Sequence, residues 1–345
     1  MAEIIRDYQD SFKTTNFTAA INEVETQSGL INATGLFETT GTTEKAIVLD
    51  KNTYNITLLP QVNRGSHSQT TGKERKSETF SLPLAYFKHL DTLTAEDILG
   101  WRAPGRTDKE TVERASAEKV EDMRFLADET DEYLKLQAMK GIFKTPDGTT
   151  MANMFTEFGV SQSSVNFELD TGTTDVNAKI MELKRKVKDG LKTSGMNGID
   201  VYLDELTFDK LVSHASMKSY YLVGDAASRP YRDATEEYMQ WGVMDIFTHK
   251  GVRFIQYNPT SNLPTGSTED FLASGTGIAI PRGARGLFRG YNGPTNKLSQ
   301  LGAPGQSRYL RTYVDPRDDY VEFELEMAPL YFCTQPACLV GITDN

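Results

Sequence analysis

The most regular pattern of hydrophobic and polar positions lies in residues 107–140 and predicts one long helix. Thr107 and Glu110 have the spacing of a capping box, in which each side chain binds a free backbone N–H at the helix start. Gly141 ends the pattern. A helix of this length spans roughly 50 Å, which suits an extended subunit better than a compact domain. Its inward stripe is predicted to contain Val112, Ser116, Val120, Met123, Ala127, Thr130, Leu134 and Ala138.

A second pattern predicts a long two-stranded excursion before this helix. Two β-rich runs, 46–49 and 54–59, flank Asp50 to Asn52, so we expect a tight turn there. Residues 64–76 contain no apolar side chain, and the alternating pattern resumes at 79–84. A two-stranded ribbon is marginally stable alone in water. We therefore expect the excursion to rest on another surface and to carry a flexible basic tip.

The remaining chain predicts an α+β fold. Residues 1–43 are polar with scattered apolar positions, which is typical of an arm that packs against another surface. A helix is expected over 175–191, with its buried face made of Val176, Ile180, Leu183, Val187 and Leu191. Elsewhere we expect strands at 199–203, 252–257 and 277–280, helices at 206–214 and 233–241, and a loop at 290–309.

The last clear element is a strand with a strict period of two. Its apolar face is predicted to consist of Val321, Phe323, Leu325 and Met327. The opposite face is a row of carboxylates from Glu322, Glu324 and Glu326. A row of this kind is expected to form a solvated or subunit-facing edge.

Composition and charge exclude several classes of protein. The 345 residues carry 48 acidic and 37 basic side chains, so the formal charge is 37 − 48 = −11. This acidity argues against a dedicated nucleic-acid binder, whose phosphate contacts need clustered Lys and Arg. The first residues do not resemble a secretory signal, and no stretch is apolar enough to span a membrane. The two cysteines, Cys333 and Cys338, are expected to be packing residues in a reducing cytoplasm.

The motifs of common catalytic and metal sites are absent from the sequence. It contains no phosphate-binding loop, dinucleotide fingerprint, nucleophile elbow or zinc-protease motif. Structural or surface roles are expected for the four histidines, His67, His89, His214 and His249. The ligand spacing of a calcium loop is missing around Asp315, Asp318 and Asp319. We therefore expect no enzyme, cofactor or metal, but an extended subunit that assembles.

Short stretches along nearly the whole chain share the pattern of one family. In chain order they are Gly35–Glu38, Leu58–Pro60, Arg64–Gly65, Leu82–Pro83, Thr94–Arg102, Met123–Arg124, Asp128–Thr130, Lys140–Ile142, Asp147–Gly148, Asp315–Arg317, Ala328–Leu330 and Pro336–Val340. In this order they resemble the major capsid proteins of lambda-like tailed phages, which share the Hong Kong 97-type shell fold.

The resemblance implies an α+β Hong Kong 97-type capsid fold with an N-terminal arm, an extended β-hairpin loop, a long spine helix, and peripheral and axial domains. Carried onto this sequence, it places the arm at 1–43 and the extended loop at 44–88. The peripheral domain with the spine helix follows at 89–155. The axial domain covers 156–309, and the closing strand of the peripheral domain and the return cover 310–345.

The function implied is that of a structural major capsid protein. Hexamers and pentamers of one chain would form an icosahedral shell around double-stranded DNA, without sequence-specific contact, in the host bacterial cytoplasm. The implied partners are a portal and a separate scaffold protein, since no long extension precedes the arm, with trimming of the mature chain as the alternative. A decoration protein is left open. A bacterial nanocompartment shell remains an alternative with the same fold. An enzyme with an unrecognised site and a fibre or tail protein are further alternatives.

Charge predicts one contact between subunits. The tip at 64–76 carries one acid, Glu74, and four bases, giving 4 − 1 = +3 from Arg64, Lys73, Arg75 and Lys76. From Asp108 to Lys135 there are five bases and ten acids, giving 5 − 10 = −5. We predict that the tip lies over a neighbouring spine helix and meets Glu121, Asp122, Asp128 and Glu129. The alternative is a solvated, mobile loop.

Overall fold

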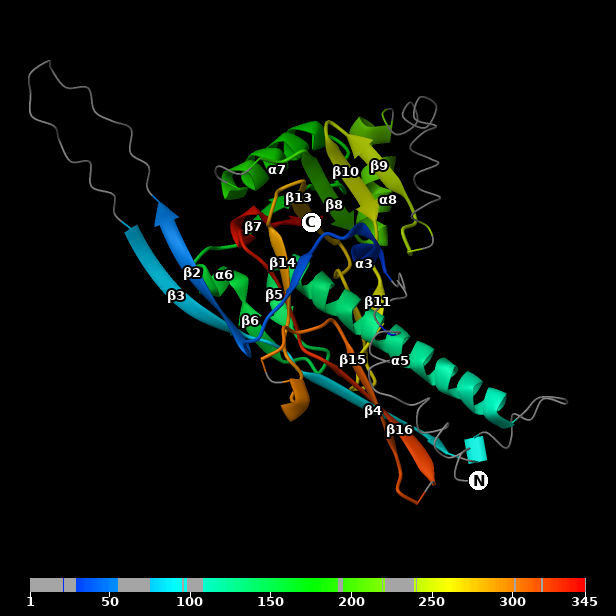
Figure 1. Ribbon diagram of the computed structural model, residues 1–345. Coiled ribbons are helices and arrows are strands. Elements are labelled where there is room, and N and C mark those ends of the chain that lie inside the picture. Colours follow the sequence, from blue (N-terminus) through cyan, green and yellow to red (C-terminus); the bar gives the residue numbers. More distant parts are fainter. Residues whose placement is uncertain are drawn as a thin grey trace, which may run out of the picture.

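The computed structural model describes residues 21, 29–54, 75–94, 96–97, 108–191, 195–218, 220, 239, 241–300, 302–317 and 319–344, with the backbone alone at 50–54, 75–78, 108–113 and 299 (Figure 1). Several predictions therefore fall wholly or largely on residues outside this part of the chain. They include the capping box at Thr107, the β-rich run at 54–59, His67, most of the arm, most of the tip at 64–76 and most of the helix at 233–241.

The predicted long helix is confirmed as α5 (Asp108–Met139). Met123 and Ala127 are buried on the predicted stripe, as are Leu134 and Ala138 further along. The second half of α5 is buried more widely than one stripe, since Tyr133, Leu136, Gln137 and Met139 are also covered. Other elements therefore pack against α5 from more than one side.

A three-stranded sheet covers the first half of α5. It has the order β15 (Tyr309–Val314), β16 (Tyr320–Met327) and β4 (Phe87–Thr94). Its apolar face joins the helix in a core of Leu93, Met123, Ala127, Leu310, Val321, Phe323, Leu325 and Met327, together with Ile21. The alternating apolar residues predicted for the closing strand thus face the core.

A six-stranded sheet forms the other large part of the molecule. Its order is β7 (Ser163–Asn166), β18 (Val340–Thr343), β13 (Thr276–Arg282), β8 (Gly198–Leu203), β10 (Val252–Gln256) and β9 (Ile246–His249). The predicted helices are confirmed as α7 (Val176–Leu191) and α8 (Glu205–Ser213), and all five apolar residues predicted for α7 are buried. Because β18 lies in this sheet, residues 340–343 join the part predicted as the axial domain. The domain boundaries themselves stay a prediction.

A smaller sheet lies between these two parts. Its order is β1 (Glu38–Gly41), β14 (Phe288–Asn292) and β17 (Pro329–Cys333). The predicted loop at 290–309 is therefore wrong at both ends, since Gly290 to Asn292 pair with β17 and Tyr309 begins β15. Glycine and asparagine suggested a turn, but Gly290 leaves room for the Tyr331 ring, which lies 2.8 Å from where a Cβ would be. Between these ends, η1 covers Leu298–Gln300.

The predicted two-stranded excursion is confirmed, but its turn is not at Asp50 to Asn52. β2 (Ala46–Tyr54) runs straight through those residues and pairs with β3 (Arg75–Pro83) in one unbroken antiparallel ladder. In Figure 1 the end of this ribbon that contains the end of β2 and the start of β3 projects away from the body of the molecule. Its base is held, because Leu82 is buried and the Phe80 ring meets the Phe158 ring edge-on at 5.1 Å.

Two hairpins and two short helices complete the described path around α5 and α7. β5 (Ile142–Lys144) and β6 (Thr150–Asn153) form a hairpin that leads into α6 (Met154–Glu157). β11 (Thr260–Asn262) and β12 (Thr268–Asp270) form another hairpin, and η2 covers Pro336–Cys338 beneath α7.

The described part of the predicted arm packs on its own chain through a carboxylate of α5. Glu132 accepts hydrogen bonds from the backbone N–H groups of Ile31 (2.9 Å) and Asn32 (2.8 Å), at the start of α3 (Leu30–Thr34). The Tyr257 hydroxyl donates to the same carboxylate at 2.9 Å. Burial raises the pKa of Glu132, while these donors oppose the rise. Gly29, with a φ of 83°, lies against the same side chain.

The carboxylate row of the closing strand is not a solvated edge, so that prediction is wrong. Glu324 and Glu326 are buried under the loop that follows β14. Lys297 from this loop lies 2.6 Å from Glu324 Oε1, and Thr295 donates to Glu326. Lys88 on β4 lies 2.5 Å from Glu324 Oε2. Burial alone would raise the pKa of Glu324, but these lysines outweigh it and lower the pKa to about 2.

A charge on the inward face of α5 should prevent folding. We expect Met123→Asp and Leu134→Asp to abolish soluble expression, because each places an unpaired charge in a core. Phe125→Asp is the matched control, since that side chain is 59% exposed on the same helix. Soluble yield and circular dichroism are the measurements. Soluble, folded Met123→Asp protein would contradict the orientation of α5.

Glu132 should make Gly29 more sensitive to substitution than Gly35. Both glycines have positive φ, so an added methyl group strains either backbone by about 1 kcal/mol. At Gly29 the new Cβ would also lie 2.2 Å from Glu132 Cδ, whereas at Gly35 nothing lies within 4 Å. We expect Gly29→Ala to lower the free energy of unfolding by about 1–3 kcal/mol more than Gly35→Ala in urea denaturation. Equal losses would contradict the described docking of α3.

The Glu324 ion pairs should contribute stability that disappears in acid. Because the pKa is lower in the folded state, the contribution is present above the unfolded pKa of about 4.3 and is lost as pH falls toward 2. Glu324→Gln should cost roughly 2 kcal/mol at neutral pH. This difference from wild type should shrink steadily below about pH 4.3. Glu322→Gln, on the same face of β16, is the control. A difference that stays constant down to pH 3 would refute the pairing.

Candidate functional site

The outward side of α5 combines acidic and apolar side chains. Glu121, Asp122 and Glu129 are exposed there, and Phe125 and Leu126 are 59% and 44% exposed between them. Spacings of three and four residues place them on neighbouring turns of one helix face. Glu129 is open to solvent on one side, but partial desolvation by its neighbours on the helix and the nearby Asp128 raise its pKa. A charged, partly apolar strip of this kind suits a protein contact better than a catalytic site.

Asp128 does not belong to this outward strip, which corrects one predicted contact residue. It is buried and forms an ion pair with Arg308, just before β15. Arg308 also lies 3.8 Å from Asp131, which accepts a hydrogen bond from the Tyr331 hydroxyl at 3.1 Å. Burial raises the pKa of Asp131, against the pull of the nearby cations. Asp128 and Asp131 bind residues on or next to β15 and β17, so their charges are already paired within the same chain.

The basic residues predicted at the tip are only partly within the described chain. Arg64 and Lys73 lie outside it. Arg75 and Lys76 begin β3, where their backbones pair with Tyr54 and Thr53. In Figure 1 this end of the ribbon and the first half of α5 lie on opposite sides of the molecule. The backbones of Arg75 and Lys76 therefore lie far from the acidic strip of α5 in the same chain.

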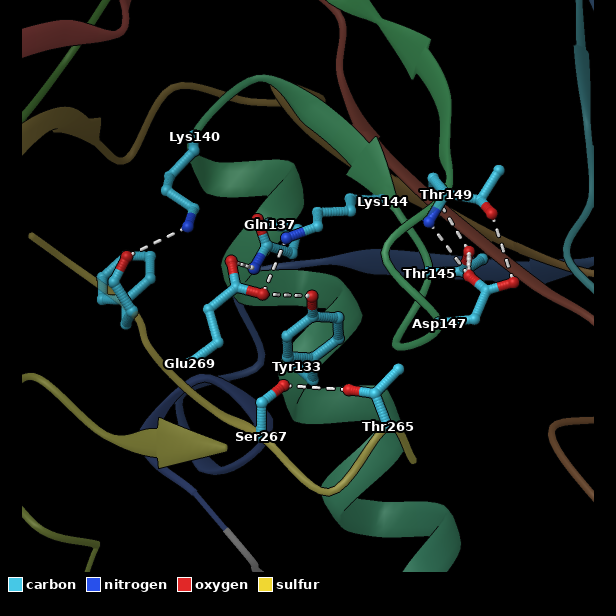
Figure 2. A network of polar contacts seen from close by, with 11 residues as sticks. Tyr133, Gln137, Lys140, Lys144, Thr145, Asp147, Thr149, Thr265, Ser267 and Glu269 are labelled. Carbon is cyan, nitrogen blue, oxygen red and sulfur yellow. Dashed lines mark hydrogen bonds and ion pairs between the residues drawn. The ribbon is translucent and has the colours of Figure 1, made fainter. Parts of the chain in front are cut away.

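A second polar network, which the sequence did not suggest, joins the β11–β12 hairpin to α5 (Figure 2). Glu269 on β12 accepts hydrogen bonds from the Tyr133 hydroxyl (3.1 Å) and Gln137 Nε2 (3.4 Å), and pairs with Lys144 (2.7 Å). Burial opposes ionisation of Glu269, but Lys144 and Tyr133 outweigh it and lower the pKa. Lys140 donates to the Phe271 carbonyl at 3.0 Å. The network fixes the β11–β12 hairpin against the end of α5 and against β5.

The histidine and cysteine side chains that could act in catalysis are hydrogen-bonded or buried within the fold. The ring of His214 is bonded to Ser216 Oγ (2.8 Å) and the Thr171 carbonyl (3.2 Å). Cys333 and Cys338 are buried, and burial raises the pKa of the Cys333 thiol. Within the described ranges, no group of three or more His, Cys, Asp or Glu is placed to hold a metal ion. The same ranges contain no helix that is long and apolar enough to cross a membrane.

Comparison with known proteins identifies the family. A family profile described as phage major capsid protein E matches residues 13–343. The chain is 28% identical to the major capsid protein of Salmonella phage Felix O1, over 96% of both chains. It is also 28% identical to the major capsid protein of Pseudomonas phage KPP10, over 93% of this chain and 94% of that one.

Solved structures show the same fold. A prophage protein of E. coli CFT073, described as a capsid protein, aligns with a TM-score of 0.62 at 12% identity. The alignment covers 96% of this chain and 99% of that one. This likeness confirms the predicted α+β capsid fold of Hong Kong 97 type, and the matches in sequence favour a phage capsid over a nanocompartment shell. The chain therefore belongs to the phage major capsid protein E family, and its function is to form the icosahedral shell of a tailed phage.

Proposed function

We propose that copies of this chain bind one another by laying the tip of the β2–β3 ribbon on the outward strip of a neighbouring α5. The observation that carries this proposal is the ribbon itself, which projects from the body in Figure 1. Two strands alone are marginally stable in water, so a neighbouring surface would stabilise them. Shell subunits gain their assembly energy from such surfaces.

Charge and apolar area support the pairing of these two surfaces. The tip has a formal charge of 4 − 1 = +3 over residues 64–76. On the outward strip of α5, Glu121, Asp122 and Glu129 are available to a neighbour, whereas Asp128 is used within the chain. One exposed ion pair contributes about 0.2–1 kcal/mol. Phe125 and Leu126 add apolar area that the isolated chain leaves exposed.

The finer features of assembly belong to the same proposal. The subunits would form hexamers and pentamers in the cytoplasm of the host bacterium and enclose double-stranded DNA without reading its sequence. A portal and a separate scaffold protein would take part, and a decoration protein could bind outside. The chain would act as a structural subunit without an active site of its own. Electron microscopy of the expressed protein tests this, and closed shells with six-fold and five-fold units are expected.

Reversing the charge of the tip should block assembly without unfolding the subunit. We expect Arg75→Glu with Lys76→Glu to keep the circular dichroism of the wild type but to form no shells at low salt. The same contact in wild type should weaken near 1 M salt, where the Debye length is roughly 3 Å. Sedimentation and electron microscopy are the measurements.

A charge swap and a control make the assembly test specific. Glu121→Lys with Asp122→Lys should restore assembly of the tip variant, because the two surfaces again have opposite signs. Lys45→Glu changes an exposed cation at the base of the ribbon and should assemble normally. If the tip variant forms normal shells by itself, the tip is not an electrostatic subunit contact.

A further inference from the structure

One end of the six-stranded sheet gathers basic side chains from separate elements. Strands β8 and β10 begin there, β13 ends there, and α7 lies across the sheet (Figure 1). Lys184 Nζ donates to the Lys250 carbonyl at 2.7 Å, which joins α7 to the β9–β10 turn. We call this cluster the basic end and define it as Lys184, Arg185, Lys188, Lys250 and Arg282.

The basic end is short of carboxylates. Within the described residues, Arg185, Lys188 and Lys250 have no ion pair, whereas cations elsewhere, such as Lys119 and Lys144, do. Three acids lie among the cluster, and one of them, Glu182, pairs with Lys186 at 2.7 Å. Asp189 is exposed, and Asp200 is buried between Arg282 (3.3 Å) and Arg253 (2.8 Å). Counting Arg253 and Lys186, the balance is 7 − 3 = +4 on a chain whose formal charge is −11.

Stabilisation of a helix end does not explain this cluster. A cation in the last turn of α7 interacts favourably with the helix dipole, which accounts for Lys188 but not for Lys184 and Arg185. Lys250 and Arg282 come from the β9–β10 turn and from β13, so the dipole of α7 does not require them. Lys250 also has a φ of 51°, in a two-residue turn where Asn or Gly is easier to accommodate. Lys250 therefore places a cation at a position whose backbone conformation does not favour a lysine.

We propose that the basic end binds the phosphate backbone of double-stranded DNA on the inner side of the shell. This inference rests on the proposed enclosure of DNA. Clustered Lys and Arg neutralise phosphates and release counterions, and this interaction does not depend on base sequence. About four contacts per subunit give binding that is weak at physiological salt. The acidic remainder of the chain keeps this attraction local, so the packaged DNA can still move.

Anisotropy of a fluorescent mixed-sequence DNA duplex, titrated with unassembled full-length protein, tests the proposal. We expect affinity to fall about a hundredfold between about 50 and 200 mM salt, as for about four phosphate contacts. Lys188→Glu with Lys250→Glu should bind at least tenfold more weakly than wild type at the lower salt. The matched control is Lys218→Glu with Arg317→Glu, an equal change of charge at exposed positions outside the cluster, and should bind nearly as wild type.

Three outcomes would overturn the proposal. The two double variants could bind DNA equally, which would remove the role of the cluster. Closed wild-type shells could bind added DNA as tightly as free subunits, which would place the basic end outside. The Lys188 and Lys250 variant could bind DNA normally but fail to assemble, which would assign the cluster to an acidic surface of a second copy. Failure of wild type to form any shell would instead count against the proposed function.

Discussion

Carboxylates buried along the second half of α5 determine how the rest of the chain is arranged. A buried carboxylate is costly unless donors and cations surround it. Asp128 forms an ion pair with Arg308, and Asp131 accepts a hydrogen bond from the Tyr331 hydroxyl. Glu132 accepts hydrogen bonds from the start of α3 and from Tyr257. Each acid thus requires a different distant segment to be in place. Removing one segment would leave a charge without partners, so the packing around α5 is specific as well as stable.

The elements that the sequence predicted best are those with one buried face. The period of α7 and the alternation in β16 both mark which residues point inward, and all of them are buried. Periodicity does not say what covers the opposite face. The row of Glu324 and Glu326 had the pattern of a solvated edge. Lys297, from a loop far away in sequence, turns it into a buried ion cluster.

The acidic residues of α5 also show that a sequence pattern does not reveal which side chains are exposed. Summing charges from Asp108 to Lys135 predicted a strongly acidic helix, but Asp128, Asp131 and Glu132 are buried and matched within the chain. The exposed part of that charge is smaller than the sum, and apolar Phe125 and Leu126 share the surface. The Glu269 network was not predictable, because one acid in a short hairpin gives no pattern. The resemblance to a capsid family came from the order of short stretches, which local periodicity cannot supply.

The position of β18 in the six-stranded sheet has a consequence for the timing of folding. β18 is an inner strand, bonded to β13 on one side and to β7 on the other. Until residues 340–343 have been synthesised, β7 has no partner strand in this sheet, so the sheet stays incomplete at that edge. A partly synthesised subunit therefore lacks the finished sheet. Joining of incomplete subunits through this edge is disfavoured by the topology.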